Sequence, residues 1–415
     1  KSFKVPDFYR SPLISKIKQF RRLQDPRKSD FSPSVLDFGP VTYYLARHFG
    51  FCYGVENAIE IAFRALEENP GKRLFLISEM IHNPEVNRDL KDRGVQFLHD
   101  TLGQELIPLS VLTPEDVVMI PAFGAPLSIL EQLQKMGIPT QSYNTTCPFV
   151  ERVWKKSEQI GKQDYTIIIH GKHNHEETRS TFSRAERDSR AVVVIRDLDE
   201  AKKLGEYVNG SKGQAEFESA FKAKFSKGFD VNTHLRKIGV INQTTMLASE
   251  TEEIAGYFKA LMKDQYPTDE LKAHFADTRD TLCYATNENQ DATQALLLSD
   301  ADLAIVVGGY NSSNTSHLVE LLEKKFPTYF ISSFREILDR NSIRRFIYSK
   351  KQLELVKDYL PAKDNIRIIL TSGASCPDSE LEQVILRINS FFDKARKPEE
   401  LYKDLKLNND ATQTQ

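Results

Sequence analysis

Seven short runs of apolar, mostly β-branched residues alternate with longer helical patterns, and this alternation limits most strongly what the chain can fold into. Most of these runs are apolar without a polar residue at every second position, as expected for strands buried on both faces of a sheet. Strands that alternate with helices are typical of parallel sheets. We therefore predict an α/β fold with mainly parallel sheets. The seven runs are 73–80, 116–123, 165–172, 191–198, 237–244, 302–309 and 366–373.

The chain has 415 residues, which is more than one hydrophobic core normally supports, so two or three domains are expected. Three cysteines each precede a helical pattern and divide most of the chain into parts of similar size. We use them as domain markers. The predicted division is an extension at 1–40, α/β domains at 41–147, 148–282 and 283–395, and a polar tail at 396–415.

Residues 205–230 form a polar stretch that we interpret as an insertion in the second domain. Phe217, Phe221 and Phe225 recur at intervals of four, which places them on one face of a helix. Gly228 is the expected end of that helix. The aromatic face is predicted to pack against the body of the protein and not to bind a ligand.

Composition excludes several classes of protein. The chain is 40% hydrophobic and 27% charged, with a net charge of −2, which argues against general affinity for nucleic acid. No apolar run reaches the length of a membrane span. Four cysteines in so long a chain do not make a secreted disulfide framework, so a reducing compartment is expected. We predict a cytoplasmic location, in the bacterial cytosol, or in the plastid stroma for a plant or algal source.

The first 34 residues carry a local positive charge. They contain nine Lys or Arg against three Asp or Glu, and no apolar segment follows that would make a signal peptide. One interpretation is a solvated, partly ordered arm. The other is a docking surface for an acidic partner.

Polar residues follow five of the predicted strands. Ligands of open α/β sheets bind beyond the carboxyl ends of the strands, so these residues are expected to share a pocket. The five segments are 81–84, 173–177, 243–245, 310–314 and 372–375.

Cys52, Cys147 and Cys283 each lie shortly before a helical pattern. Taken singly, each is explained as a small buried hydrophobic residue. At a helix N-terminus, however, backbone N–H groups and the helix dipole stabilise a thiolate, which is a ligand for zinc or iron–sulfur clusters. The spacings match neither a zinc ribbon nor a ferredoxin motif. Cys376 is interpreted as a small core residue.

Three thiolates instead of four would have a chemical consequence. A 4Fe–4S cluster held by three cysteines leaves one iron open, which is then able to act on a substrate oxygen as well as pass electrons.

Histidines and a glutamate follow two strand ends. His82, His173 and His175 suit either a metal or a phosphate, and phosphate recognition is favoured because no third metal ligand is evident. Glu177 is either a general acid or a surface carboxylate.

Two loops rich in small residues precede helices and are candidates for binding an anion. "GGYNSSNTSHLVELL" places hydroxyl and amide groups where a phosphate binds at a helix N-terminus, although it is not a P-loop. "TSGASCPD" is the second loop. Together with the histidines, these loops predict a diphosphate on a small ligand.

Eight motifs in order carry a resemblance to a known family. They are "FGFCYGVENAI", "EMIHNPEVNRDL", "PAFGAP", "NTTCPFVERVW", "IHGKHNHEET", "NQTTML", "NSSNTSHL" and "TSGASCPD". Over roughly 41–388, the chain resembles the 4-hydroxy-3-methylbut-2-enyl diphosphate reductases of the non-mevalonate isoprenoid pathway, and is most similar to their longer plant and cyanobacterial branch.

The resemblance implies three α/β domains arranged as a trefoil around one 4Fe–4S cluster. It implies that Cys52, Cys147 and Cys283 bind the cluster and that its fourth iron is open to substrate. Glu177 and Thr244 would orient the substrate hydroxyl, with Glu177 as the acid. A ferredoxin or flavodoxin would supply electrons, with neither nucleic acid nor membrane involved. The residues implied to bind the substrate are His82, His175, Thr244, Ser312, Ser313, Asn314 and Ser375.

The chain departs from the common bacterial pattern at one position. Where many bacterial members have a second diphosphate-binding histidine, this chain has Phe123, which donates no hydrogen bond. We therefore assign no diphosphate contact to that position. The longer branch also tends to have Phe there.

Two other functions stay open at this point. A non-redox 4Fe–4S hydro-lyase also uses three thiolates and an open iron, but its turnover consumes no reductant. A non-catalytic sensor of a diphosphate or a cluster needs no proton donor, so Glu177 and Thr244 argue against it.

Overall fold

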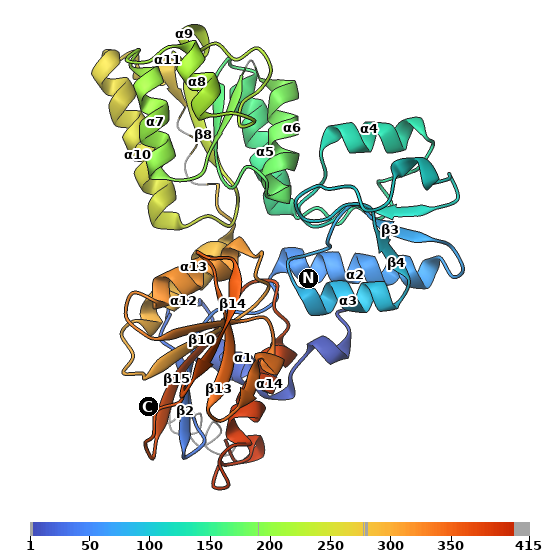
Figure 1. Ribbon diagram of the computed structural model, residues 1–415, viewed down its shortest axis with the longest axis vertical. Helices are drawn as coiled ribbons and strands as arrows, with labels where there is room; N and C mark the ends of the chain where they lie inside the picture. The colour runs from blue at the N-terminus through green and yellow to red at the C-terminus, as the bar shows by residue number, and fades with distance from the viewer. Residues whose placement is uncertain (1–2, 190, 277, 279–280, 402–415) are drawn as a thin grey trace. The chain divides into compact units, whose positions relative to one another are not determined.

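The computed structural model describes residues 3–189, 191–276, 278 and 281–401. These residues form two compact units (Figure 1). Unit 1 comprises residues 1–56, 82–84 and 287–415, and unit 2 comprises 57–81 and 85–286. Helices α2 (Tyr53–Glu68) and α12 (Tyr284–Leu296) each run from one unit into the other.

Unit 1 is built on a five-stranded sheet in the order β1-β2-β15-β10-β11. Strands β2, β15, β10 and β11 run parallel, and β1 pairs antiparallel with β2 at the edge. The strands are β1 (Ser34–Asp37), β2 (Val41–Leu45), β10 (Leu303–Val307), β11 (Thr328–Ile331) and β15 (Ile366–Ser372).

Helices and a second, small sheet complete unit 1. An antiparallel sheet contains β12 (Ile337–Asp339), β13 (Ser342–Ile347) and β14 (Gln352–Lys357), which no motif in the sequence predicted. The helices are α1 (Pro12–Gln24), α13 (Ser313–Leu322) and α14 (Asp378–Asn389).

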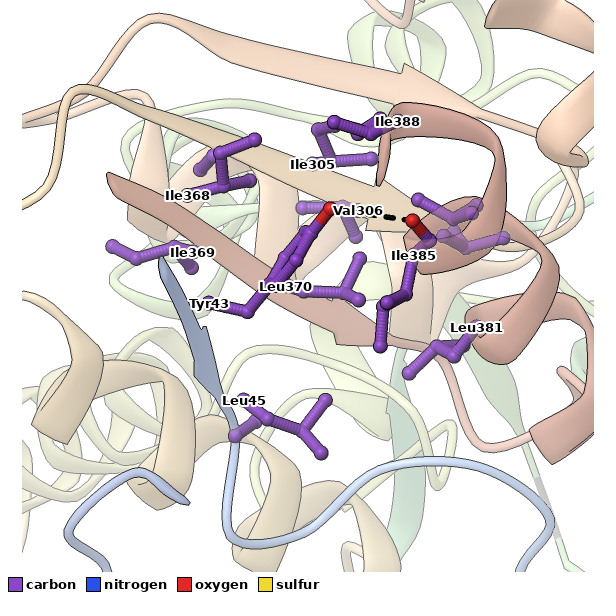
Figure 2. Packing of buried hydrophobic residues seen from close by; sticks show 14 of the residues in the cluster. Tyr43, Leu45, Ile305, Val306, Ile368, Ile369, Leu370, Leu381, Ile385 and Ile388 are labelled. Atoms are coloured by element: carbon purple, nitrogen blue, oxygen red, sulfur yellow. Dashed lines mark hydrogen bonds between the residues drawn. The ribbon is translucent and has the colours of Figure 1, made fainter. Parts of the chain in front are cut away.

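The core of unit 1 joins the sheet to α14. Ile368, Ile369 and Leu370 of β15 are fully buried beside Tyr43 of β2 (Figure 2). The Tyr43 hydroxyl donates to the Asn389 side chain at 2.9 Å, and it also lies 3.4 Å from the Ile385 carbonyl oxygen, the contact dashed in Figure 2. A buried hydroxyl with such partners avoids the cost of an unpaired polar group.

Helix α1 of the basic N-terminal segment packs into this core, so the interpretation of the segment as a solvated arm is wrong for this helix. Ser11 caps α1 by accepting from the Ile14 N–H at 2.9 Å. Leu13, Ile14 and Ile17 of the same helix are at most 2% exposed and belong to the core cluster of unit 1. Deleting the segment would therefore remove core residues as well as charge.

Unit 2 contains two further parallel sheets, in the orders β4-β3-β5 and β7-β6-β8-β9. Helices α5 and α6 cover one face of the second sheet, and α7 and α10 cover the other (Figure 1). The strands are β3 (Leu74–Leu76), β4 (Val95–Phe97), β5 (Val117–Met119), β6 (Thr166–His170), β7 (Val192–Ile195), β8 (Ile238–Asn242) and β9 (Phe275–Ala276). The helices are α3 (Pro84–Asp92), α4 (Leu127–Lys135), α5 (Pro148–Gly161), α6 (Glu176–Asp188), α7 (Leu198–Val208), α8 (Gln214–Ala220), α9 (Val231–His234), α10 (Ala248–Gln265) and α11 (Leu271–His274).

The predicted α/β fold with mainly parallel sheets is confirmed, and all seven predicted strands are present. Strand β2 pairs with β15 of the C-terminal part, whereas the sequence had placed residues 41–147 in one domain. The three-domain division and its trefoil arrangement stay predictions. The predicted polar tail lies outside the described residues from residue 402 onward.

The aromatic insertion packs as predicted, but its helix is shorter. Phe217 and Phe221 are at most 1% exposed, and their rings stack with centroids 5.2 Å apart. Helix α8 ends at Ala220, not at Gly228. The following residues run along the edge of β7, where the Val194 N–H donates to Lys224 O at 2.7 Å. An edge strand needs such a partner, and this requirement overrides the helical spacing.

No helix among the described residues has the length and apolar character needed to span a membrane.

Acidification is expected to destabilise unit 1 through His48. Burial, together with neighbouring Arg47 and Lys28, lowers the pKa of His48 to about 4. The unfolded chain keeps a pKa near 6.5, so it binds the proton first and stability is lost as the pH falls from about 6.5 towards 4. His48→Gln should flatten this part of the curve. Urea midpoints of both proteins across this pH range measure the effect, and parallel curves would contradict it.

Candidate functional site

Three neighbouring strands of unit 1 deliver predicted site residues to one edge of the sheet. The chain runs from β2 to Cys52, from β10 to Ser312 and Asn314, and from β15 to Ser375. The carboxyl ends of parallel strands meet at the same edge. The structure thus brings together residues that the sequence places more than 300 positions apart.

Asn314 presents a buried donor at this edge. Its Oδ1 accepts from the Ala374 N–H at 2.9 Å and from the Asn289 side chain at 3.2 Å. Its Nδ2 is buried and has no hydrogen-bond partner among the described residues. Because the backbone N–H of Ala374 identifies the oxygen, the unpaired atom is the amide nitrogen. An unpaired buried donor is costly unless a ligand accepts from it.

Ser312 caps helix α13 by accepting hydrogen bonds, which leaves its hydroxyl hydrogen available for donation to another group. Its Oγ accepts from the Thr315 N–H at 3.2 Å and from the Thr315 hydroxyl at 3.0 Å. The Ser375 hydroxyl instead donates to His82 O at 3.0 Å. Ser312 and the helix N-terminus are therefore ready to donate to an anion, while Ser375 positions the His82 segment.

Gly309 permits the His82 segment to approach the end of β10. A Cβ on Gly309 would lie 2.3 Å from His82 O, which is closer than such atoms come in proteins. His82 is 4% exposed, so its side chain is held within this edge of unit 1.

Glu177 and Thr244 form a hydrogen-bonded pair in unit 2. Strands β6 and β8 are neighbours, and these two residues follow their carboxyl ends. The Thr244 N–H donates to Glu177 Oε1 at 2.6 Å, and the Thr244 hydroxyl donates to Oε2 at 2.9 Å. Glu177 is 1% exposed, so the interpretation as a surface carboxylate is wrong.

The two contacts of the Glu177 carboxyl group differ in whether the partner is able to accept a proton. A backbone N–H only donates, whereas a hydroxyl both donates and accepts. A proton on Glu177 Oε2 would therefore have the Thr244 hydroxyl oxygen as its acceptor.

His175 caps the helix that carries Glu177. Its Nδ1 accepts from the Glu177 N–H at 3.1 Å, so neutral His175 holds its proton on Nε2. The ring of Phe123 packs edge-on against the imidazole, with centroids 5.5 Å apart. Phe123 thus orients His175 without donating a hydrogen bond. His173 is exposed, so the two histidines of this loop differ in environment.

The three predicted cysteine ligands all lie directly before helices. Cys52 precedes α2, Cys147 precedes α5 and Cys283 precedes α12. The Cys52 and Cys147 carbonyls accept the first helical hydrogen bonds. Cys376 is fully buried in the core of unit 1, as predicted.

Burial opposes ionisation of the unit 2 thiols. It raises the pKa of Cys147 to about 11, although the N–H groups of Phe149 and Val150 act in the other direction. Burial also raises the pKa of Cys283, against the opposing effect of Thr286. The sequence suggested that the helix N-termini would stabilise thiolates, but these N-termini alone do not outweigh burial. A bound cation would have to displace the thiol protons.

The donor set of these thiols suits an iron–sulfur cluster. The Cys147 and Cys283 thiols are close enough to influence each other, and backbone N–H donors face each sulfur. Such donors stabilise anionic sulfur once it binds metal. Cys52 belongs to unit 1 and the other two to unit 2. Within the described residues, no three His, Cys, Asp or Glu side chains meet around one metal position, so the three-thiolate site stays a prediction.

The loop at 121–126 links Cys147 to the helix of Glu177, a role that the sequence did not reveal. The Cys147 N–H donates to Ala122 O at 2.9 Å, and the Ser180 hydroxyl donates to Phe123 O at 2.7 Å. Gly124 has φ +74°, and a Cβ there would lie 2.5 Å from the Trp154 ring. In the sequence, Gly124 was the only sign that this loop makes a tight turn against its neighbours.

Fold and site together define a class of protein. In unit 1, Ser312, Asn314 and the N-terminus of α13 form a candidate anion site, here called the anion cradle. In unit 2, the buried Glu177–Thr244 pair follows two strand ends. Polar groups beyond the carboxyl ends of parallel strands are typical of α/β proteins that bind and transform small ligands. The family model described as LytB protein matches residues 43–389, and the chain belongs to this family.

Curated relatives agree with this assignment. The 4-hydroxy-3-methylbut-2-enyl diphosphate reductase of Trichodesmium erythraeum is 37% identical over 381 residues, covering 92% of this chain and 89% of that protein. The enzyme of the same name from Microcystis aeruginosa is 40% identical over 370 residues, covering 89% of each.

Two solved structures share the fold. The first, of (E)-4-hydroxy-3-methyl-but-2-enyl diphosphate reductase, matches with a TM-score of 0.50 at 24% identity and covers 83% of this chain and 98% of that one. The second, of the E-1-hydroxy-2-methyl-but-2-enyl-4-diphosphate reductase from Plasmodium falciparum, has a TM-score of 0.60 at 23% identity, with coverages of 86% and 90%.

Proposed function

We propose that the protein reduces 4-hydroxy-3-methylbut-2-enyl diphosphate to isopentenyl and dimethylallyl diphosphates. The reaction takes up two electrons and two protons, breaks the carbon–oxygen bond of the hydroxyl group and releases water. The observation that carries the proposal is the buried Glu177–Thr244 pair, in which a carboxyl group contacts a hydroxyl that is able to relay a proton. Its relatives' names and the ordered motifs supply the substrate.

The cofactor is proposed to be one 4Fe–4S cluster. Cys52, Cys147 and Cys283 would hold it, with the fourth iron open to substrate. When bound, such a cluster supplies electrons and Lewis acidity at the substrate oxygen. The sulfur ligands would be deprotonated on binding.

The diphosphate is proposed to bind at the anion cradle of unit 1 and at His175. Asn314 Nδ2 and the Ser312 hydroxyl have hydrogens to donate, and Ser313 lies in the first turn of α13. Neutral His175 contributes its Nε2–H. His82 is the proposed fifth contact, and Ser375 holds the His82 backbone in place.

The proton route follows from the hydrogen bonds of the unit 2 pair. Glu177 Oε2 passes its proton to Thr244 Oγ1, which in turn donates its own proton to the departing hydroxyl oxygen. The Thr244 N–H then stabilises the carboxylate through Oε1. Because Glu177 is buried, bulk water does not compete for that proton.

One anaerobic experiment tests the function. The purified protein is analysed for iron and sulfide, and then supplied with the diphosphate substrate and reduced methyl viologen. We expect iron to be present, with two viologens oxidised per product molecule. Conversion without oxidation of viologen would indicate a hydro-lyase, and substrate binding without conversion would indicate a sensor.

The electron donor is proposed to be an acidic ferredoxin or flavodoxin that docks beside the N-terminal segment. The ring of Phe3 packs against Tyr53 with centroids 4.9 Å apart, and Tyr9 packs against Phe51 at 5.8 Å. Phe51 and Tyr53 flank Cys52 in the sequence. Exposed basic residues of the segment therefore lie next to a proposed cluster ligand, as electron transfer requires.

Reversing two of these charges should weaken activity that depends on the protein donor. Lys4→Glu/Arg10→Glu is expected to raise the KM for reduced ferredoxin about 3- to 10-fold at low salt, because electrostatic steering is lost. Activity with methyl viologen should stay unchanged. Lys202→Glu/Lys203→Glu on α7 makes the same change of charge on exposed residues and is the control. Equal effects of the two variants would contradict this docking site.

None of the four cysteines, all of which are among the described residues, forms a disulfide, which supports the proposed location in a reducing compartment such as the cytosol.

A further inference from the structure

Thr286 contacts both a proposed cluster ligand, Cys283, and the backbone of Thr244, which pairs with Glu177. It lies three residues after Cys283, in the first turn of α12. Its N–H donates to Cys283 Sγ at 3.3 Å, and its hydroxyl oxygen lies 3.1 Å from the same sulfur. The hydroxyl also lies 2.9 Å from the carbonyl oxygen of Thr244, the residue that contacts Glu177.

A single hydroxyl hydrogen serves one of these acceptors at a time. While Cys283 is a thiol, the sulfur donates and the Thr286 hydroxyl points to Thr244 O. A sulfur that ligates iron carries no hydrogen and only accepts, so the Thr286 hydroxyl at 3.1 Å is then placed to donate to it. Thr286 is fully buried, so water does not compete for either contact.

The unit 2 cysteines differ in this respect. Hydrogen bonds to the Cys147 sulfur come from the backbone N–H groups of Phe149 and Val150. The Cys283 sulfur has a side-chain hydroxyl, that of Thr286, beside it in addition to backbone N–H groups. A side-chain contact is one that a substitution removes while the helix stays intact.

We propose that Thr286 is a positioning residue that sets the reduction potential of the cluster through the Cys283 sulfur. The inference rests on the proposed function, because it takes Cys283 as a cluster ligand. Hydrogen bonds to a cluster-ligating sulfur offset its negative charge and favour the reduced cluster, so they raise the potential. By the same hydroxyl, Thr286 links the charge on the cluster to the backbone of Thr244.

The test compares Thr286→Val with Thr286→Ser. Valine keeps the shape of threonine but has no hydroxyl, whereas serine keeps the hydroxyl. Each protein is reconstituted anaerobically with iron and sulfide, and its midpoint potential is measured by a redox titration followed by electron paramagnetic resonance. We expect a lower potential for Thr286→Val than for the wild type, and a potential close to the wild type for Thr286→Ser.

An unchanged potential in Thr286→Val would overturn the proposal, as would equal shifts in both variants. If Thr286→Val fails to hold iron, Thr286→Ala is measured in the same way, and its potential decides the question. A wild-type protein without iron would refute the cluster and hence the proposed function, an outcome distinct from a loaded cluster with an unchanged potential. Loss of turnover alone would not support the proposal, because a purely structural role gives the same result.

Discussion

Glu177→Gln is expected to lower turnover by about 10²- to 10⁴-fold while leaving iron content and substrate affinity near those of the wild type. Glutamine fits the space of glutamate and accepts from Thr244, but it has no acid proton to pass to the Thr244 hydroxyl. The proposed route of the proton is therefore interrupted at its source. Single-turnover and steady-state rates with reduced methyl viologen measure the loss.

Glu176→Gln is the matched control for this variant. Glu176 is the preceding residue of α6 and is also buried, at 4% exposed, but it lies beside Arg179 at a small cavity. The Glu176→Gln variant makes the same change of charge and of side-chain shape as Glu177→Gln, one position earlier in the helix. We expect it to retain most of the wild-type rate. If the Glu177 and Glu176 variants lose activity equally, the effect reflects the charge or folding of α6 and not a proton donor.

Thr244→Val separates the two roles of Thr244. The variant keeps the N–H that donates to Glu177 Oε1 but removes the hydroxyl between Oε2 and the substrate. In the proposed route, Thr244→Val affects the same proton transfer as Glu177→Gln, so the double variant should be little slower than Glu177→Gln alone.

Much of this site was predictable from the sequence because parallel sheets gather the residues that follow their strands. Cys52, Ser312 and Ser375 come from three neighbouring strands of one sheet, and their residue types already indicated thiolate and anion chemistry. The motifs also located the helices α5 and α13, at whose N-caps Cys147 and Ser312 lie. Local sequence thus specified which groups lie at a strand end.

What the sequence did not reveal are the contacts between loops. The alternation of apolar runs does not say that β2 pairs with β15, since pairing depends on contacts between residues far apart in the chain. Nor does it say that Gly124 lies against Trp154, or that Thr286 contacts both a cysteine and Thr244. The predicted C-terminal end of α8 was wrong for the same reason. Residues after Ala220 have helical spacing in the sequence but hydrogen-bond to the edge of β7.

Replacing any one of the three helix-capping cysteines by serine is expected to abolish reductive activity and to remove most of the iron. Serine keeps the size of cysteine, but its hydroxyl is far less acidic and binds iron weakly compared with a thiolate. Iron and sulfide content after anaerobic reconstitution, together with the visible absorbance of the cluster, measure the loss. We expect Cys52→Ser, Cys147→Ser and Cys283→Ser to behave alike.

Cys376→Ala is the control for these variants. Cys52→Ser is the most decisive of them, because it tests whether both units supply ligands. Cys376 is fully buried in the core of unit 1, so its alanine variant should lose some stability but retain wild-type iron. Cys147 and Cys283 belong to the same unit, whereas Cys52 belongs to the other. A cluster that needs all three must draw ligands from both units. Full iron content in Cys52→Ser would therefore refute the shared site even if the other two variants lost their iron.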